Sequence, residues 1–274
     1  MKTVGVIVRP RFPAGADAAR QLLAFLEAKG LGVRMPPYLA EALGRPELSS
    51  ELREMRVDIA VTVGGDGTVL FASHHLPPRV PLLPVNLHSF GFLAECGTDD
   101  MLPTLEKVIL GDFEVQDALR LSASTQGERF PDATNEVSLF PHELGRPPSI
   151  EVHVQDSPPL KCRADGVIIA TPIGSTAHAL SVSGPVLDPG LDAILIVAAT
   201  PLRHSFVPLV VPGSTQIRVL MNKPAHLIMD GDQLASLPAG TAVTVRKAKA
   251  SLRIVRRGSS FYSRLQGKLL GCSP

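Results

Sequence analysis

Hydrophobic positions in the first hundred residues follow two alternating patterns, one typical of buried strands and one typical of helices. Thr3–Val8 is a β-branched run, and Val57–Val63 is an apolar run with little alternation, as expected of a parallel strand covered on both faces. Between them, Ala14–Lys29 carries apolar residues at helical spacing and is followed by Gly30, a common helix terminator. This strand–helix–strand order predicts an α/β domain with a parallel sheet.

Two further elements extend this domain. Leu82–Val85 is predicted to be a third short strand. Thr98 is predicted to cap a helix that reaches Leu110, with Asp99 and Asp100 in its first turn, where the helix dipole favours carboxylates.

The pattern changes at Phe113, from which short β-rich stretches are separated by Gly, Pro, Asp and Ser. Gly174–Ser183 is the exception and predicts a short helix or tight turn, while Ser260–Leu270 predicts a helix that packs back on the first domain. The predicted fold is therefore a Rossmann-like α/β domain over residues 1–112, a β-sandwich or similar domain over 113–256, and a returning C-terminal helix within 257–274. The predicted strands of the β-rich part are Ile150–Val154, Gly166–Thr171, Ala193–Ala198, Phe206–Val211, Gln216–Met221, Ala242–Lys247 and Leu252–Val255.

Composition fits a globular protein and excludes two classes of partner. The chain has 274 residues, of which 45% are hydrophobic and 19% charged. Its 27 basic and 26 acidic residues give a net charge of +1, which favours neither nucleic acid nor an anionic membrane. Any anion must therefore be bound by a local site.

The cysteines indicate a reducing compartment. Cys96, Cys162 and Cys272 are far apart and form no C-x-x-C pair, which argues against disulfides and a zinc site. The longest apolar run, Ala193–Thr200, is much shorter than the roughly 20 residues that span a bilayer. We therefore expect a soluble, cytoplasmic protein.

Candidate chemistry begins directly after Val63, where Gly64-Gly65-Asp66-Gly67-Thr68 precedes the helical run Val69–His75. Glycines allow close backbone approach, and a strand-to-helix turn presents N–H groups to phosphate. A carboxylate inside such a loop is expected only if it accepts a proton or holds Mg²⁺. The alternative is a plain tight turn in which Asp66 caps the helix. The loop matches neither the Walker A sequence nor G-x-G-x-x-G.

The loop GGDGT resembles a signature shared by NAD kinases and by diacylglycerol- and sphingosine-type lipid kinases. Three further blocks resemble NAD kinases in particular. They are Asn135-Glu136 before an apolar strand, Arg163-Ala164-Asp165-Gly166 leading through VIIATP into Gly174–Ser181 and Ser183-Gly184-Pro185, and Asp230-Gly231-Asp232-Gln233. The matches keep the family's order from residue 64 to about 233.

This resemblance implies transfer of the γ-phosphoryl group of ATP, or of polyphosphate, to the 2′-hydroxyl of the adenosine ribose of NAD. It implies Mg²⁺ or another divalent cation with ATP, no fixed protein metal site, and a homodimer or homotetramer. Asp66 would be the general base, and Gly64, Gly65, Gly67 and Thr68 would form the phosphate loop. The implied NAD-binding residues are Asp66, Gly67, Asn135, Glu136, Arg163, Asp165, Thr176, Ala177, His178, Ala179, Leu180, Ser181 and Gln233.

The sequence departs from the family pattern around the ligand. His178 replaces a Tyr, His88 replaces a Gly, and Val207 replaces an Arg before Pro-Leu. The late motif carries an extra residue, so Asp232 or Gln233 fills the glutamine position. Two other hypotheses stay open from the sequence, a GGDGT-type lipid kinase and a non-catalytic nucleotide-binding regulator.

Overall fold

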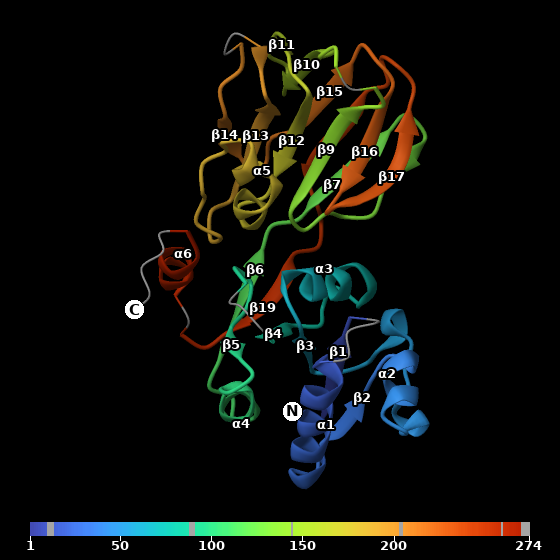
Figure 1. Cartoon of the computed structure of the whole chain (residues 1–274), viewed down its shortest axis with the longest axis vertical. Helices are drawn as coiled ribbons and strands as arrows, with labels where there is room; N and C mark the ends of the chain where they lie inside the picture. The colour runs from blue at the N-terminus through green and yellow to red at the C-terminus, as the bar shows by residue number, and fades with distance from the viewer. Residues whose placement is uncertain (10–13, 88–90, 144, 203–204, 259, 270–274) are drawn as a thin grey trace. The chain divides into compact units, whose positions relative to one another are not determined.

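The computed structural model describes residues 1–9, 14–87, 91–143, 145–202, 205–258 and 260–269. The chain divides into two compact units (Figure 1). The first contains Met1–Asp117 and the described part of Leu252–Pro274, and the second contains Ala118–Ser251. The first unit is thus made of two separate segments, because the chain leaves it and later returns.

A seven-stranded sheet forms the centre of the first unit, in the order β2-β1-β3-β4-β19-β6 with β5 paired to β4. Pairing is parallel from β2 through β1, β3 and β4 to β19. The strands are β1 (Thr3–Val8), β2 (Gly32–Arg34), β3 (Ile59–Val63), β4 (Leu82–Asn86), β5 (Cys96–Gly97), β6 (Glu114–Ala118) and β19 (Leu252–Arg256).

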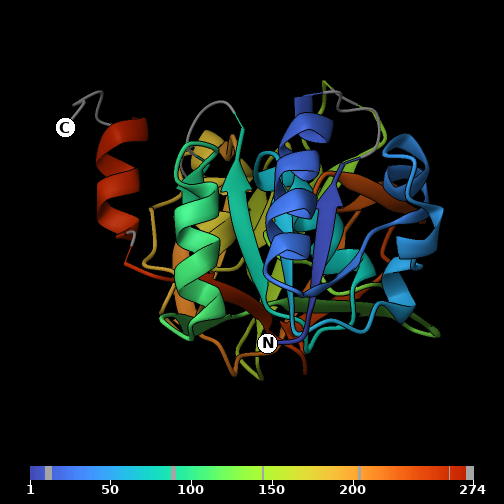
Figure 2. The ribbon, with the colours of Figure 1, turned by 90° about the horizontal axis from the view of Figure 1, so that it is seen from below.

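Helices cover both faces of this sheet, which explains why every residue of β3 and β4 is buried. Figures 1 and 2 show α1 and α4 on one face and α3 on the other. Leu22 and Leu26 of α1 and Leu105 of α4 join one apolar core with Val61. The helices are α1 (Ala14–Ala28), α2 (Pro37–Ala42), α3 (Asp66–His75), α4 (Met101–Ile109) and α6 (Phe261–Leu269), with single 3₁₀ turns at Pro46–Leu48 and Leu52–Glu54.

The second unit is a sandwich of two six-stranded sheets, in the orders β11-β10-β15-β18-β7-β8 and β14-β13-β12-β9-β16-β17. Side chains from both sheets form one apolar core. The strands are β7 (Leu121–Thr125), β8 (Glu128–Arg129), β9 (Glu136–Pro141), β10 (Ser149–Val154), β11 (Leu160–Arg163), β12 (Gly166–Ala170), β13 (Ala193–Ala199), β14 (Leu209–Pro212), β15 (Ile217–Met221), β16 (Ala225–Met229), β17 (Asp232–Leu237) and β18 (Val243–Lys247).

Strand β12 is buried on both faces for two different reasons. Val167 and Ile169 point into the sandwich core. Ile168 and Ala170 point outward and pack against Ala179 of the short helix α5 (His178–Ser181). A 3₁₀ turn, η3 (Ile173–Thr176), connects β12 to α5. The predicted short helix in Gly174–Ser183 is therefore confirmed.

The predicted combination of a parallel-sheet domain and a β-sandwich is confirmed, but three local expectations are corrected. The helix expected to start after Thr98 begins at Met101, so Asp99 and Asp100 precede it and Thr98 does not cap it. Strand β19 pairs with β4 in the first unit, whereas the boundary at residue 256 assigned this segment to the β-rich domain. A short β pattern identifies a strand but not the sheet that it joins.

Strand β6 moves the predicted boundary at residue 112 in the same way. Glu114–Ala118 lies beside β19 in the first sheet, so the first unit extends to Asp117 and not only to residue 112. Within the described part of the chain, no helix is both long and apolar enough to cross a membrane.

Candidate active site

The GGDGT loop connects β3 to α3, and its shape depends on Gly64. This residue has a φ of +153°, and a Cβ built on it would lie 2.1 Å from the Thr68 Oγ1 atom. The Gly64 N–H donates to the Val85 carbonyl at 2.9 Å, which holds the loop to β4. Gly65 occupies the N-cap position of α3 and is exposed. Any larger side chain at Gly64 would push Thr68 away from the turn.

The Asp66 carboxylate is held by a separate segment of the chain. Its Oδ2 atom accepts the Phe92 N–H at 2.9 Å, and its Oδ1 atom accepts the Leu93 N–H at 3.1 Å. A Cβ on Gly91 would lie 2.0 Å from Oδ1, so only glycine leaves room there. Asp66 is the first residue of α3 and not its cap. The plain capping turn is therefore not what the structure contains.

Three arginines lie near this loop, and two of them interact with its carboxylate. The Arg9 Nη1 atom lies 3.1 Å from the position of a Cβ on Gly67. Arg256 and Arg264 both interact electrostatically with Asp66. Burial, with a smaller contribution from the charge of Arg264, lowers the pKa of Arg256 to about 10, so Arg256 stays charged at neutral pH. Sequence reasoning missed these arginines, since no motif marks them.

In the second unit, Asp230 organises the start of β9. Its carboxylate accepts the N–H groups of Thr134 at 2.7 Å, Asn135 at 2.6 Å and Glu136 at 3.1 Å. Asp230 adopts a φ of +51° and Gly231 a φ of +90°, which makes the tight turn from β16 into β17. The resemblance marked Asp230 as part of a motif, but its structural role was not predicted.

Glu136 is a buried carboxyl group, with only 5% of its surface exposed. Burial, with a smaller contribution from the negative charge of Asp230, raises its pKa to about 8. Its Oε2 atom has no hydrogen-bond partner within the described residues. Buried polar atoms are normally paired, so an unpaired one is a candidate for ligand binding.

The Gly174–Ser181 block is fixed directly against Asn135. A Cβ on Gly174 would lie 2.0 Å from the Asn135 carbonyl oxygen. The Thr171 hydroxyl donates to the Thr134 carbonyl at 2.7 Å and accepts the Gly174 N–H at 2.9 Å. The second unit therefore brings Asn135, Glu136 and this block together. The resemblance implies that all of them bind NAD.

The side chains of this block differ in exposure. His178 is exposed, and its ring stacks on Phe140 with centroids 5.4 Å apart and an interplanar angle of 14°. Ala179 is buried, while Ser181 is exposed. Thr176, Ala177 and Leu180 are half-buried.

Arg163 and Asp165 lie elsewhere in the second unit. They precede β12, whereas Thr171 follows it, and six residues of extended chain span about 20 Å. Asp165 accepts a hydrogen bond from the Thr200 hydroxyl. Arg163 is exposed, and its Nη2 atom lies 3.4 Å from the Pro147 carbonyl. The structure thus does not group these two residues with Asn135 and Glu136.

Asp232 and Gln233 are the first two residues of β17, opposite Met229 and Ile228 of β16. Both are exposed, and the ladder is irregular between Leu227 and Ile228. His88 and His204 lie outside the described residues.

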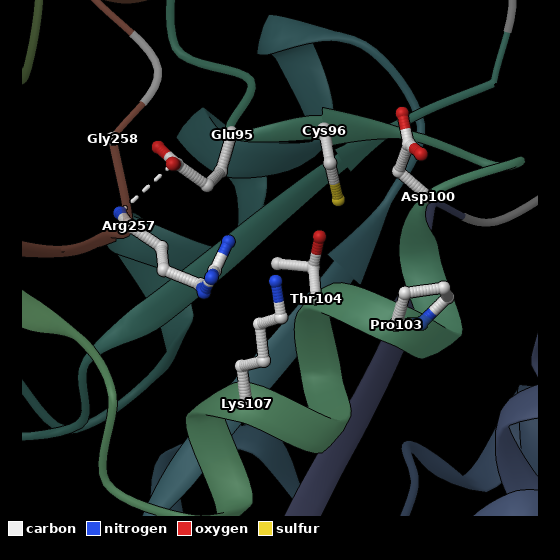
Figure 3. A pocket seen from close by; sticks show the side chains of 8 residues that line it. All are labelled: Glu95, Cys96, Asp100, Pro103, Thr104, Lys107, Arg257 and Gly258. Atoms are coloured by element: carbon white, nitrogen blue, oxygen red, sulfur yellow. Dashed lines mark hydrogen bonds between the residues drawn. The ribbon is translucent and has the colours of Figure 1, made fainter.

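A cavity of about 390 Å³ lies in the first unit beside β5 and α4, and none of the predicted site residues lines it. Figure 3 shows Glu95 at one side, where its carboxylate accepts the Arg257 N–H at 2.8 Å. Cys96 and Lys107 also line the cavity, and burial raises the pKa of the Cys96 thiol to about 11. Among the described residues, no group of three or more His, Cys, Asp or Glu side chains is placed to hold a metal.

A Rossmann-like unit with a carboxylate-bearing glycine loop, combined with a β-sandwich unit that carries the buried Glu136, is typical of a phosphate-handling class of protein. Models of protein families identify the family within this class. The ATP-NAD kinase N-terminal domain matches residues 4–113, and the ATP-NAD kinase C-terminal domain matches residues 134–257. The chain belongs to the NAD kinase family.

Individual relatives agree with this assignment. The chain is 33% identical to the NAD kinase of Methanothermobacter thermautotrophicus, over 98% of this chain and 97% of that one. It is 34% identical to the NAD kinase of Geobacter sulfurreducens, over 98% of each. The resemblance that the sequence motifs carried is thereby confirmed, and the lipid-kinase alternative is disfavoured.

Solved structures also resemble this fold. Yeast NADH kinase complexed with NADH superposes with a TM-score of 0.90 at 25% identity, covering 99% of this chain and 88% of that one. An NAD kinase from Archaeoglobus fulgidus in complex with ATP superposes with a TM-score of 0.80, over 99% of this chain and 100% of that one. At 24% identity, the second likeness concerns the fold alone.

Proposed function

We propose that this chain transfers the γ-phosphoryl group of ATP to the 2′-hydroxyl of the adenosine ribose of NAD, giving NADP, with Asp66 as general base. The observation that carries the proposal is the Asp66 carboxylate, oriented within the GGDGT loop by the Phe92 and Leu93 N–H groups. The relatives named above are NAD kinases, and the two solved structures contain NADH and ATP, respectively.

The chemical step needs alignment more than covalent help. The ribose oxygen bonds to the γ-phosphorus as the bond from that phosphorus to the ADP oxygen breaks, and the hydroxyl proton passes to Asp66. Two backbone N–H groups fix both carboxylate oxygens, which limits the directions from which a hydroxyl can approach. Each oxygen keeps lone pairs for a further contact. Asp66 therefore acts as both a proton acceptor and a positioning group.

The loop also offers positive charge for phosphate. The Arg9 guanidinium beside Gly67 and the N-terminus of the ten-residue helix α3 are both suited to anions. Carboxylate oxygens such as those of Asp66 fit Mg²⁺, which prefers oxygen ligands. Bound with ATP, Mg²⁺ would neutralise charge on the transferring phosphoryl group. Arg9 adds to that neutralisation from the protein side.

We assign dinucleotide binding to the second unit. Asn135 and Glu136 would bond to ribose hydroxyls and adenine, which gives the unpaired Glu136 Oε2 atom a partner. The small, partly exposed residues from Thr176 to Ser181 would form a wall beside the flat base. His178, already stacked on Phe140, can present a ring in place of the family's Tyr. Gln233 belongs to this group through the turn at Asp230.

The position of Arg163 and Asp165 supports an oligomer. At about 20 Å from the Glu136 end of β12, they would serve the far end of the dinucleotide or a ligand of a neighbouring subunit. We therefore propose a homodimer or homotetramer, which light scattering can measure. Free, buried Cys96 and Cys162 fit a cytoplasmic enzyme.

The decisive experiment compares Asp66→Asn with the native enzyme. The amide can accept only one of the two N–H groups and cannot accept the hydroxyl proton in the same way. NADP formation with ATP and Mg²⁺ should fall by about 10²-fold or more. Calorimetry should still detect NAD binding. Asp17→Asn, at an exposed ion pair with Arg20, is the matched control and should stay fully active.

Near-normal turnover of the Asp66→Asn enzyme would contradict the assigned role. NAD binding without NADP formation by the native enzyme, with ATP or with polyphosphate as donor, would instead favour the non-catalytic regulator. The same two assays identify the phosphate donor.

A further inference from the structure

The segment that holds Asp66 is itself irregular and needs support. Phe92 and Leu93 belong to neither a helix nor a strand, yet their N–H groups bind the carboxylate. The Glu95 N–H donates to the Pro84 carbonyl of β4 at 2.8 Å, which fixes one end of the segment. At its centre, the Leu93 carbonyl accepts the Arg256 Nη1 group at 2.9 Å. Leu93 thus binds Asp66 through its N–H and Arg256 through its carbonyl.

Arg256 makes this contact from within a buried network. Its side chain is only 13% exposed and comes from β19. Its Nε atom donates to Gln116 Oε1 at 2.9 Å, and Nη1 lies 3.4 Å from Glu95 Oε2. The Glu95 side chain is 3% exposed, and its other oxygen accepts the Arg257 N–H (Figure 3). All of these residues belong to the first unit.

We propose that Arg256 is a positioning residue for phosphoryl transfer, which holds Leu93 so that its N–H orients the Asp66 carboxylate. The inference rests on the proposed role of Asp66 as general base. Arg256 makes no hydrogen bond to Asp66 among the described residues, although the two charges interact. Its hydrogen-bonded connection to Asp66 runs through Leu93, and Glu95 supports it by contacting the guanidinium.

The geometry requires an arginine at this position. A planar guanidinium can bond to Gln116, Leu93 and Glu95 at once from fixed directions, whereas a lysine ammonium offers a single point of attachment. The buried positive charge is balanced by the buried Glu95 carboxylate. A change of about 1 Å in a catalytic group can reduce turnover by about 10²-fold. A small shift of Leu93 would therefore suffice to lower activity.

The test measures kcat and KM for Arg256→Gln, Arg256→Lys and the control Arg253→Gln. Arg253 lies on the same strand and contacts the Arg79 carbonyl and Asp117, away from Leu93. Arg256→Gln should lower kcat by about 10- to 100-fold, while KM for ATP and NAD changes by less than about threefold. Arg256→Lys should restore part of kcat, and Arg253→Gln should match the native enzyme.

A double-mutant cycle with Asp66→Asn separates positioning from a general structural role. If Arg256 acts through Asp66, adding Arg256→Gln to Asp66→Asn should lower the remaining kcat by less than about threefold. The same loss in both backgrounds, or a native kcat for Arg256→Gln, would overturn the inference. Near-native turnover of Asp66→Asn alone would instead remove the proposed function.

Glu95→Gln keeps the test decisive if Arg256→Gln does not fold. The amide oxygen can still accept the Arg257 N–H, but the ionic contact with Arg256 is lost. We expect Glu95→Gln to lower kcat less than Arg256→Gln does. In the Asp66→Asn background, Glu95→Gln should have almost no further effect on kcat. Equal effects in both backgrounds would count against the positioning role.

Discussion

At the scale of single residues, the buried Glu136 makes stability depend on pH. Its pKa is about 8 in the folded chain, against 4.5 for an exposed glutamate, mainly because burial disfavours the charge. Between these values the folded chain holds a proton that the unfolded chain has released. Stability therefore falls as the pH rises from about 4.5 to about 8.

Glu136→Gln removes this dependence, because the amide has no proton to lose. Without ligand at pH 8, the variant should be more stable than the native chain by about 4 kcal/mol, and the difference should fall below about 1 kcal/mol at pH 5. Thermal unfolding followed by circular dichroism at both pH values measures this. Glu151→Gln, at an exposed pair with Lys161, should show no gain at pH 8. An equal effect of Glu136→Gln at both pH values would refute the burial argument.

A short local motif singles out Asp66 in the sequence, because a carboxylate among glycines is unusual. Its role as general base stays a prediction. The three N–H groups held by Asp230 were not predicted, because Asp230 lies more than 90 residues from them in the chain. Arg256 was missed for the same reason, since it lies 163 residues from Leu93.

At the scale of elements, the contact of Gly174 with Asn135 joins η3 and α5 to the start of β9. The obstructing atoms are backbone, the nearest at 2.0 Å, so they cannot rotate away as a side chain would. Gly174→Ala should therefore displace the turn, destabilise the protein by about 1–3 kcal/mol and weaken NAD binding by about tenfold or more. Calorimetric titration with NAD and thermal unfolding measure the two effects.

Gly97→Ala is the matched control, because a Cβ at Gly97 would meet nothing within 4 Å. Native NAD affinity in the Gly174→Ala protein would show that the block does not depend on this contact.

Elements were predictable as types but not always in their partners. Helical spacing identified α1, and continuous apolar runs identified β1 and β3. The strand Leu252–Arg256 was also recognised, yet it was assigned to the wrong sheet. Its pairing with β4 joins two strands that are about 170 residues apart in the sequence. No local pattern encodes such a pairing.

At the scale of the whole molecule, the first unit depends on a segment that follows the second unit in sequence. Strand β19 lies between β4 and β6, and its Ile254 and Val255 are fully buried. The second unit, in contrast, is continuous over Ala118–Ser251 and has its own core. The two units should therefore respond differently to being expressed alone.

We expect the fragment 118–251 to fold by itself, with a β-rich spectrum and a cooperative thermal transition. The fragment 1–117 should fail to fold, because without β19 the Leu82 end of β4 loses its partner and β6 has no neighbouring strand. Joining residue 117 directly to 252–274 through a short Gly/Ser linker should restore folding. The Asp117 Oδ1 and Arg253 Nε atoms are 3.7 Å apart, so the two ends are close enough to connect. A native-like fold of 1–117 alone would show that β19 is dispensable, and failure of the linked chain would show that the first unit needs more than its own two segments.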